Sequence, residues 1–436
     1  MRFSTREVAE VTGGVLHGPD VLVSGAAVDS RLITGGELFI PLRAERDGHA
    51  FIDAAIGAGA AAYLTEEPPR RGIAVTVDDT WAAMTALASH ARDRAADAVA
   101  IGVTGSVGKT TTKDMIRAVL APMYTTHAST RSYNNEIGVP LTLLGAPEDA
   151  GAVVVELGAR ARGDIAALCR VARPSIGVVT RVAPVHTESF GDIDEVARAK
   201  RELVEALPPQ GTAVLNADDQ RVAAMAEVAR GTVVWFGTSG DGDVRAEVLD
   251  LDEELRPRAR FTTPGGTIVV RLSARGAHQV QNAAAAVAVA LACHVQLPGI
   301  AEALERAEMS PQRMSLSVNE RGVRVLDDSY NANPASVEAA LRSLADLPAR
   351  RRVAVLGFMA ELGAMEAPEH ERMANVAARL GIEVIAVDAP QYGVDCLTPD
   401  EVVDRLAGLG DGDAVLVKGS RVVGLDGLAA TLRALG

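Results

Sequence analysis

The sequence has 436 residues, and 43 Lys and Arg against 57 Asp and Glu give a formal net charge of −14. This acidic balance, without a run of five basic residues, argues against nonspecific nucleic-acid binding, and no segment approaches the ~18 apolar residues that a membrane span needs. Only four of the basic residues are lysines, so each is a candidate for chemistry that a permanently charged arginine does not perform; they are Lys109, Lys113, Lys200 and Lys418.

Residues 1 to about 80 combine short apolar runs with turns, a pattern that predicts a small α/β module. We expect one Ala-rich helix from Ile52 to Gly59, with short strands and turns before it and the strands AAYLT and IAVTV after it. The helical periodicity of Thr80 to Ala96 predicts a connector to the next module.

From about residue 98, strands and helices alternate, which predicts a parallel, doubly wound sheet of the P-loop ATPase type. An antiparallel patch is expected between about 244 and 272, followed by an Ala-rich helix from Gln279. A break near Ser310-Pro311 precedes a third, Rossmann-like α/β module. We therefore expect an α/β protein of three domains, comprising residues 1–82 with a connector to 97, 98–308 and 309–436.

Three cysteines lie apart from one another without metal-ligand spacing, namely Cys169, Cys293 and Cys396. This usage is typical of reduced and mostly packed thiols in a cytoplasmic protein. The N-terminus carries charges within its first residues and does not read as a signal peptide.

The segment IGVTGSVGKTTTKDM, residues 101–115, carries the strongest functional signal. A strand enters a Gly-rich turn and then a helix, so backbone amides converge where a phosphate can bind. Lys109 would pair with the β- and γ-phosphates, and the Thr110 hydroxyl would bind Mg²⁺. Val103 stands where the usual phosphate loop has its first glycine, and Gly105 follows instead. The segment predicts ATP binding.

Three further residues are candidates at the same edge of the sheet. Glu156 ends the strand VVVELG, where it is either a Mg²⁺ ligand or an ordinary solvated strand end. His186 follows the strand IGVVT, where it has either a metal or transition-state role or a structural one. Lys200 sits between Arg198 and Arg201, either as a solvent-facing helix residue or as a desolvated amine able to react covalently.

These segments together resemble the Mur ligase family along essentially the whole chain. The resemblance is carried by GVTGSVGKTTTK, SYNNEIGVPLTLL, ELG, VHTESFGD, AKREL, LNADD, GAHQVQNAAAA, PQRM, DDSYNANPAS, MAELG and VLVKGSR. Two passages favour the members that use D-alanyl-D-alanine, DDSYNANP and VDSRLITGGELFIPLRAERDGHAF.

The resemblance implies a role for particular residues. Near the UDP-sugar it places Asp29, Ser30, Arg31, Asp47, Gly48 and His49. Around ATP it places Gly105, Ser106, Gly108, Lys109, Thr110, Thr111, Asn282, Arg313, Asp328, Tyr330 and Asn331. The peptide and dipeptide side of the cleft receives Asn134, Asn135, Asn333, Lys418, Ser420 and Arg421. The catalytic and metal-site residues are Lys109, Thr110, Glu156, His186 and Lys200, the last as a carbamate formed with carbon dioxide.

The implied activity is an ATP-dependent amide ligase. It would activate the carboxylate of UDP-N-acetylmuramoyl tripeptide as an acyl phosphate and add D-alanyl-D-alanine, forming ADP and phosphate. This step belongs to peptidoglycan precursor synthesis, and therefore to cell wall biogenesis, cell shape and cell division. We expect a cytoplasmic monomer whose third domain closes over ATP and Mg²⁺.

Two departures from the family pattern leave alternatives open. The family's Gly-Asp-Met is Gly357, Phe358 and Met359 here, and its Thr-Asn is Thr180 and Arg181, both expected to border the cleft. A paralogue that ligates a different amine or carboxylate in a specialised peptide pathway is one alternative. An inactive ATP-binding interaction module is the other, although the phosphate loop and its candidate metal residues are all present.

Overall fold

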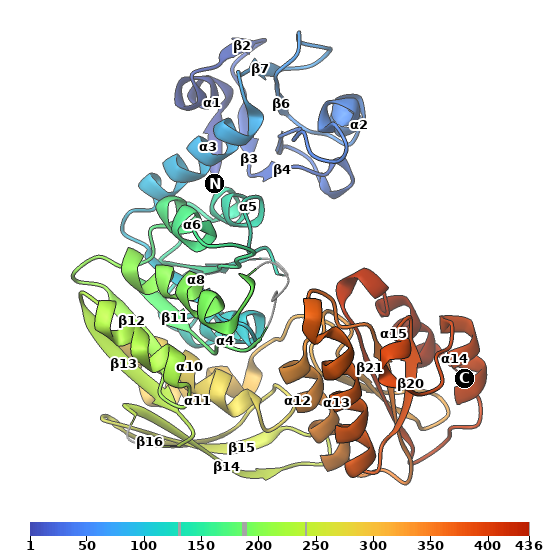
Figure 1. The fold of residues 1–436 in the computed structure, drawn as a ribbon. Coiled ribbons are helices and arrows are strands. Elements are labelled where there is room, and N and C mark those ends of the chain that lie inside the picture. The colour runs from blue at the N-terminus through green and yellow to red at the C-terminus, as the bar shows by residue number, and fades with distance from the viewer. Residues whose placement is uncertain (130–131, 185–189, 240–241, 436) are drawn as a thin grey trace.

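The computed structural model describes residues 1–129, 132–184, 190–239 and 242–435, which form three α/β regions built around separate sheets. Figure 1 shows the N-terminal region (blue) at one end of the central region and the C-terminal region (orange to red) beside it. The α/β prediction is confirmed. Among these described residues, no helix has the length and apolarity needed to cross a membrane.

The N-terminal region contains a five-stranded sheet in the order β2-β7-β6-β5-β4 and a separate pair, β1 with β3. The strands are β1 (Arg2–Ser4), β2 (Val15–His17), β3 (Leu22–Ser24), β4 (Ala26–Ala27), β5 (Leu38–Phe39), β6 (Ala62–Thr65) and β7 (Ala74–Thr76). The helices are α1 (Thr5–Thr12), α2 (Ile52–Gly57) and α3 (Thr80–Arg94).

The expectation of one helix before residue 80 is wrong, because α1 precedes α2. Ser4 and Glu7 form a capping box at its start, and Gly13 ends it in a left-handed conformation with φ of 66°. Only Thr5, Val8 and Ala9 of this helix are buried. The helix has only eight residues, too short for its periodicity to be decisive, although the cap residues were a usable signal.

The central region is one nine-stranded sheet in the order β16-β15-β14-β13-β12-β11-β8-β10-β9. Its strands are β8 (Val99–Thr104), β9 (Thr126–Ala128), β10 (Ala152–Glu156), β11 (Ile176–Val179), β12 (Thr212–Asn216), β13 (Thr232–Gly237), β14 (Val244–Leu251), β15 (Pro257–Thr263) and β16 (Gly266–Arg271). Strands β8 to β13 are parallel, whereas β14, β15 and β16 pair antiparallel with one another, as predicted.

The helices of the central region are α4 (Lys109–Leu120), α5 (Gly138–Gly145), α6 (Asp164–Ala172), α8 (Ile193–Ala206), α9 (Gln220–Ala223), α10 (Gln279–Ala292) and α11 (Leu297–Arg306). The Ala-rich helix α10 is almost wholly buried and packs along α4. Its small side chains let the two helices approach closely beneath the phosphate loop. Helix α5 and strand β9 were not predicted, because α5 has only eight residues and contains Pro140 in its first turn.

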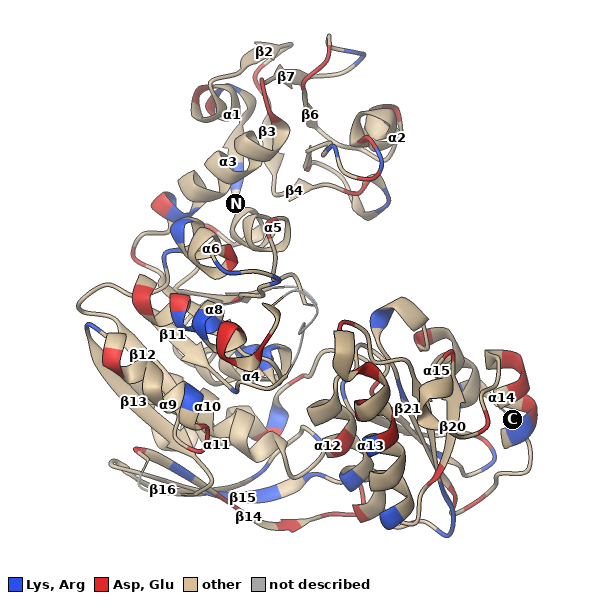
Figure 2. Ribbon diagram, viewed as in Figure 1, with Lys and Arg blue, Asp and Glu red and all other residues tan. Residues whose placement is uncertain are grey.

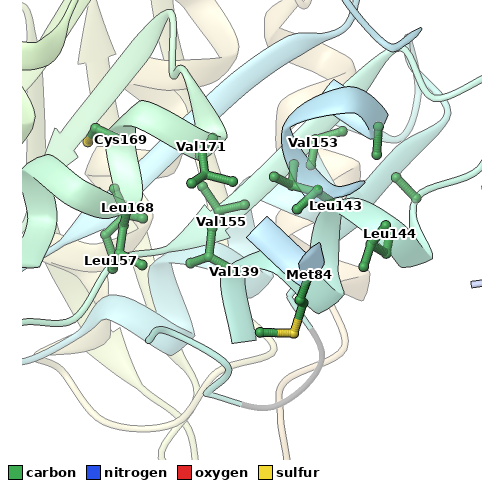
Figure 3. Close-up of a cluster of buried hydrophobic side chains, with 14 of the residues drawn as sticks. Met84, Val139, Leu143, Leu144, Val153, Val155, Leu157, Leu168, Cys169 and Val171 are labelled. Carbon is green, nitrogen blue, oxygen red and sulfur yellow. The ribbon is translucent and has the colours of Figure 1, made fainter. Parts of the chain in front are cut away.

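A shared core joins the N-terminal and central regions. Figure 3 shows Met84 of α3 beside Val139 and Leu143 of α5, with Val153 and Val155 of β10 in the same buried cluster. The connector predicted at Thr80 to Ala96 is therefore part of the packing of both regions.

The C-terminal region has a five-stranded sheet in the order β17-β18-β21-β19-β20, parallel except for β17. Its strands are β17 (Ser315–Val318), β18 (Arg324–Asp327), β19 (Arg352–Gly357), β20 (Glu383–Val387) and β21 (Ala414–Lys418). Its helices are α12 (Pro334–Asp346), α13 (Glu366–Arg379), α14 (Pro399–Leu406) and α15 (Asp426–Ala434).

Charges on the antiparallel extension of the central sheet are paired across strands. Figure 2 shows basic residues on β15 next to acidic ones on β14. Arg258 lies 2.7 Å from Asp250, and Arg260 lies 2.5 Å from Glu247. The arginines of this exposed face are thus neutralised locally, in keeping with the mixed charge of the sequence.

Candidate active site

A cavity of about 700 Å³ lies between the central and C-terminal regions, where β8, β10 and β11 end. It is lined by all the predicted ATP-binding residues and by Glu156 and Lys200. The predicted peptide-side residues Asn134, Asn135, Asn333, Lys418, Ser420 and Arg421 line it as well. The predicted UDP-sugar residues Asp29, Ser30, Arg31, Asp47, Gly48 and His49 lie in the N-terminal region and do not line this cavity. His186 lies outside the described residues.

The phosphate loop is shaped by two glycines. Gly105 has φ of 149°, and a Cβ there would lie 1.9 Å from the Thr180 hydroxyl. Gly108 has φ of 83°, and its Cβ would lie 2.3 Å from the Asn282 side chain. Val103 is a buried residue of β8, before the loop begins, so its difference from the usual glycine does not disturb the loop. The Lys109 Nζ donates to the Gly105 carbonyl at 2.8 Å, across the mouth of the loop.

Glu156 is buried, with 1% of its surface exposed, so it is not a solvated strand end. Its Oε2 accepts from the Thr110 hydroxyl at 2.8 Å, and its Oε1 accepts from the Asn134 amide at 2.8 Å. A hydroxyl and a carboxylate held together beside the phosphate loop are hard oxygen donors, which suit Mg²⁺.

Arg313 connects the two sides of the cavity. Its guanidinium donates to the hydroxyls of Thr110 and Ser132 at 3.0 Å each, and it lies 4.2 Å from the centre of the Tyr330 ring. The residues flanking it, Gln312 and Met314, both have left-handed backbones, with φ of 60° and 56°. Left-handed residues on both sides of one arginine indicate a segment held in a strained form that places that side chain.

Ser132 was not among the predicted site residues. Its hydroxyl lies 3.0 Å from that of Thr110 and accepts from Arg313. Ser132 and Thr110 are 22 positions apart, so only the fold brings the two hydroxyls together. The available signal was the segment SYNNEIGVPLTLL, which begins at Ser132.

Lys200 is 3% exposed and lines the cavity, so it is not a solvent-facing helix residue. Its pKa is lowered to about 7, chiefly by burial and also by the charge of Lys109, whereas the charge of Glu202 opposes this lowering. The Glu202 carboxylate accepts from the amides of Gly163 and Ala166 at 2.6 and 3.0 Å, which fixes α8 against the start of α6. Helix α8 thus presents a desolvated amine to the cavity from a rigid support.

Lys418 is 2% exposed and organises the loop after β18. Its Nζ donates to Asp328 Oδ2 at 2.5 Å and to the Asn331 carbonyl at 2.9 Å. Burial lowers the Lys418 pKa, whereas Asp328 raises it. A buried ion pair of this kind holds the cavity wall that carries Tyr330 and Asn331.

Lys113 has a structural place, one turn along α4 from Lys109. Its Nζ donates to the Ser129 carbonyl at 2.6 Å and lies 2.9 Å from Asp114 Oδ1. Asp114 Oδ2 accepts from the Ser310 amide at 2.8 Å, at the junction with the C-terminal region. This buried pair ties α4 to the segment that leads to Arg313.

Replacing Asp114 by Ala should lower the free energy of unfolding by about 3 kcal/mol, because Lys113 would keep a buried charge without its carboxylate. Denaturant unfolding followed by circular dichroism measures the change. The matched control is Glu302→Ala on α11, where an exposed carboxylate lies 2.7 Å from Arg306 and the expected loss is under about 0.5 kcal/mol. Equal stability of the two variants would contradict a tying role for Asp114.

The two departures from the family pattern differ in position. Arg181 is exposed and lines the cavity, and its carbonyl accepts from the Ser106 amide at 2.7 Å. Phe358 is not among the described lining residues, so the expectation that it borders the cleft is wrong. Its ring stacks on the buried His370 with centroids 5.3 Å apart, so an aromatic residue fits this position by packing.

His49 and Asp47 of the N-terminal region form a tight local unit. Asp47, His49 and Glu67 have ligand atoms within 4.8 Å of one another. However, His49 Nδ1 lies 2.6 Å from Asp47 Oδ1, and its Nε2 accepts from the Glu66 amide at 3.1 Å. Both ring nitrogens are therefore used within the protein, which favours a structural His49 over a metal ligand.

Two family models match the chain, the Mur ligase middle domain at residues 103–290 and the Mur ligase, glutamate ligase domain at residues 312–421. The chain is 37% identical to the UDP-N-acetylmuramoyl-tripeptide--D-alanyl-D-alanine ligase of Mycobacterium tuberculosis, covering 99% of this chain and 98% of the relative. It is 34% identical to the Bacillus subtilis enzyme of the same name, over 86% of this chain and 83% of that one.

Solved structures show the same similarity. A crystal structure of MurF from Acinetobacter baumannii matches with a TM-score of 0.88 and 30% identity, covering 99% of each chain. MurF ligase from Thermotoga maritima, in complex with ADP, matches with a TM-score of 0.80 and 27% identity, over 94% of this chain and 97% of that one.

Proposed function

Because the chain belongs to the Mur ligase family, we propose that it joins D-alanyl-D-alanine to UDP-N-acetylmuramoyl tripeptide with conversion of ATP to ADP and phosphate. The names of two relatives give those proteins as UDP-N-acetylmuramoyl-tripeptide--D-alanyl-D-alanine ligases. Such a reaction forms an amide bond, and we place it in peptidoglycan precursor synthesis. One observation carries the proposal: the phosphate loop, the buried Glu156 and the desolvated Lys200 converge on one cavity between two regions.

The three regions would divide the task. Residues 1–82, with the connector to 97, would bind the UDP-sugar; residues 98–308 would bind ATP; residues 309–436 would close over the cavity. Arg313, Asp328, Tyr330 and Asn331 reach the cavity from the third part, which supports closure around the nucleotide. We propose that the protein is a monomer and works in the cytoplasm.

ATP and Mg²⁺ are the expected cofactors, and the residues present fit them. Bound Mg²⁺ would neutralise charge on the phosphates and on the attacking carboxylate. Thr110 and Glu156 would hold it, and the Arg313 hydrogen bond to Thr110 would then be exchanged, because two cations cannot share that hydroxyl closely. Lys109 would place its charge on the β- and γ-phosphates from the start of α4.

Lys200 would carry a carbamate. The neutral amine attacks carbon dioxide, a C–N bond forms, one C=O electron pair moves to oxygen, and a proton leaves the nitrogen. The product exchanges a buried cation for an anionic oxygen ligand beside Lys109. A Lys200 pKa of about 7 supports this, since about half of the amines are neutral at pH 7, against roughly one in three thousand for an ordinary lysine.

The test is an ADP-release assay on the purified protein with UDP-N-acetylmuramoyl tripeptide, with and without D-alanyl-D-alanine. We expect sustained ADP formation only when both are present. Sustained turnover with another amine or another carboxylate instead would assign the chain to a paralogous ligase, in which Arg181 at the cavity is the first residue to exchange for Asn. Absence of ADP with every pair would contradict ligase activity.

A further inference from the structure

The segment that follows β11 is fastened to the phosphate loop by hydrogen bonds. The Ser106 amide donates to the Arg181 carbonyl at 2.7 Å. The Thr180 hydroxyl donates to the Val107 carbonyl at 2.6 Å, and the Ala183 amide donates to the Ser106 hydroxyl at 2.9 Å. The backbone of Arg181 is therefore held directly against the loop that we expect to bind phosphate.

The Arg181 side chain is exposed and lines the cavity, whereas its two neighbours are buried. Thr180 is 3% exposed and Val182 is 6% exposed. Because the backbone is already fixed on both sides, a ligand that meets the guanidinium has to order only the side chain. This keeps the entropic cost of such a contact small.

The other described arginines of the cavity wall are engaged within the protein. Arg160 forms an ion pair with a carboxylate 2.7 Å away, Arg313 donates to two hydroxyls, and Arg421 donates to a third. Within the described part of the chain, the Arg181 guanidinium has no hydrogen bond or ion pair of this kind. Arg181 thus brings to the cavity a positive charge that these residues leave unpaired.

The carboxylates that follow the neighbouring strand β12 are occupied by other groups. Asp219 accepts from the Val182 amide at 2.8 Å and from two amides at the start of α9. Asp218 accepts from amides and hydroxyls of the turn after β13 and from the Gln281 amide at 2.9 Å. Neither forms an ion pair with Arg181, so an anionic ligand is the partner that its charge suits.

The strand order places Arg181 away from the tripeptide side of the cavity. In the central sheet, β11 and β10 lie on opposite sides of β8, whose end leads into the phosphate loop, and β9 lies beyond β10. Asn134 and Asn135, which we propose to hold the tripeptide, follow β9, and Asn134 donates to Glu156 at the end of β10. The phosphate loop therefore lies between Arg181 and the tripeptide wall, and the phosphates of ATP are the anionic groups expected on its side.

Resting on the proposed function, we infer that Arg181 is a positioning residue that binds the phosphate chain of ATP. Lys109 would hold this chain from the start of α4, and Arg181 would hold it from the end of β11. Hydrogen bonds from a guanidinium to phosphate are charge-assisted and can be bidentate. The asparagine that the family commonly has at this position lacks the charge, so this chain should bind ATP and ADP more tightly than its own Arg181→Asn variant.

The experiment measures the Kd values of ATP, ADP and adenosine by calorimetry in the presence of Mg²⁺, the last by displacement of ADP. The unaltered protein is compared with Arg181→Asn and Arg181→Gln. We expect the Kd values of ATP and ADP to rise about 10-fold in both variants, the effect of losing a hydrogen bond to a charged group. The Kd of adenosine should change by less than about twofold, because adenosine has no phosphate for Arg181 to bind.

Steady-state kinetics separate a nucleotide contact from a contact with the other substrates. In both variants the KM for ATP should rise with its Kd, whereas the KM values for tripeptide and D-alanyl-D-alanine should stay within about twofold. The unfolding temperature should not change, because the Arg181 side chain is exposed. Arg306→Asn is the matched control, since this exposed arginine of α11 pairs only with Glu302 among the described residues and should leave every constant unchanged.

Failure of the inference and failure of the proposed function give different results. A Kd for ADP within about twofold of normal in both Arg181 variants overturns the inference and leaves the proposed function standing. An equal loss of affinity for adenosine, or a raised tripeptide KM with normal ADP binding, assigns Arg181 to another group and overturns it as well. Absence of ADP formation by the unaltered protein with tripeptide and D-alanyl-D-alanine overturns the proposed function itself, whatever the Kd values.

Discussion

Replacing Lys109 by Ala should reduce ADP formation about a thousandfold or more while leaving the fold intact. The side chain spans the phosphate loop, with Nζ 2.8 Å from the Gly105 carbonyl. An attacking carboxylate and a γ-phosphate are both anionic, so removing the cation aimed at them raises the barrier directly. Lys109→Arg should restore little, because a planar guanidinium does not fit the point position of an ammonium in this turn.

Stability should not fall in the same variant. Burial lowers the Lys109 pKa, and the cation sits at the positive end of α4, so its removal relieves an electrostatic cost. The Lys200 pKa should rise as well, since the Lys109 charge helps to lower it. Steady-state ADP release, thermal unfolding and titration of Lys200 check the three expectations. Normal turnover by Lys109→Ala would remove the phosphate loop from the mechanism.

Replacing Lys200 by Ala should remove most of the activity, roughly a hundredfold or more, and a short-chain carboxylate such as acetate should restore part of it. The small anion would enter the space left by the side chain and supply the oxygen that the carbamate provides. Lys200→Arg is the matched control, because a guanidinium keeps the charge and does not add carbon dioxide. It should be inactive and should not respond to acetate.

The carbamate also predicts the direction of a pH effect. Burial lowers the Lys200 pKa to about 7, so the reactive neutral amine is lost as the pH falls below that value. Activity should therefore decline on the acid side of neutrality, and added bicarbonate should oppose the decline. A ¹³C carbamate signal in protein equilibrated with ¹³CO₂, absent from Lys200→Arg, would identify the group. Full activity of Lys200→Ala without a carboxylate would contradict it.

Much of the architecture could be predicted from periodicity alone. The alternation from β8 to β13 consists of long apolar strands and amphipathic helices, which carry clear signals. Helices α1 and α5 were missed because each has only eight residues, too few for a repeat to stand out. Strands β9 and β17 have three and four residues and depend on their neighbours in the sheet.

The candidate site could be predicted as far as local motifs reach. Lys109 and Thr110 follow from one segment, and Glu156 and Lys200 from their places on a strand and a helix. The hydrogen bond from Arg313 to Thr110 joins residues 203 positions apart, so it depends on how the central and C-terminal regions meet. Phe358 shows a different failure: it was expected to border the cleft, but its ring stacks on the buried His370 instead. The division into three domains and the individual residue roles stay predictions.

The four lysines of the chain occupy two kinds of position in the structure. Lys109 and Lys200 line the cavity, where we propose that Lys109 supplies charge and Lys200 reacts with carbon dioxide. Lys418 and Lys113 instead form buried pairs with Asp328 and Asp114. A compact ammonium suits all four positions, because each of them encloses the side-chain nitrogen in a small space.

The most direct test of the account is an oxygen-transfer experiment. UDP-N-acetylmuramoyl tripeptide labelled with ¹⁸O in its terminal carboxylate is converted with ATP, D-alanyl-D-alanine and the purified protein, and the released phosphate is analysed by mass spectrometry. An acyl phosphate requires that one ¹⁸O per turnover appear in the phosphate, because the carboxylate oxygen that attacks the γ-phosphate leaves with it. Phosphate without ¹⁸O, formed at the same rate as the amide, would contradict activation of the carboxylate by ATP at this site.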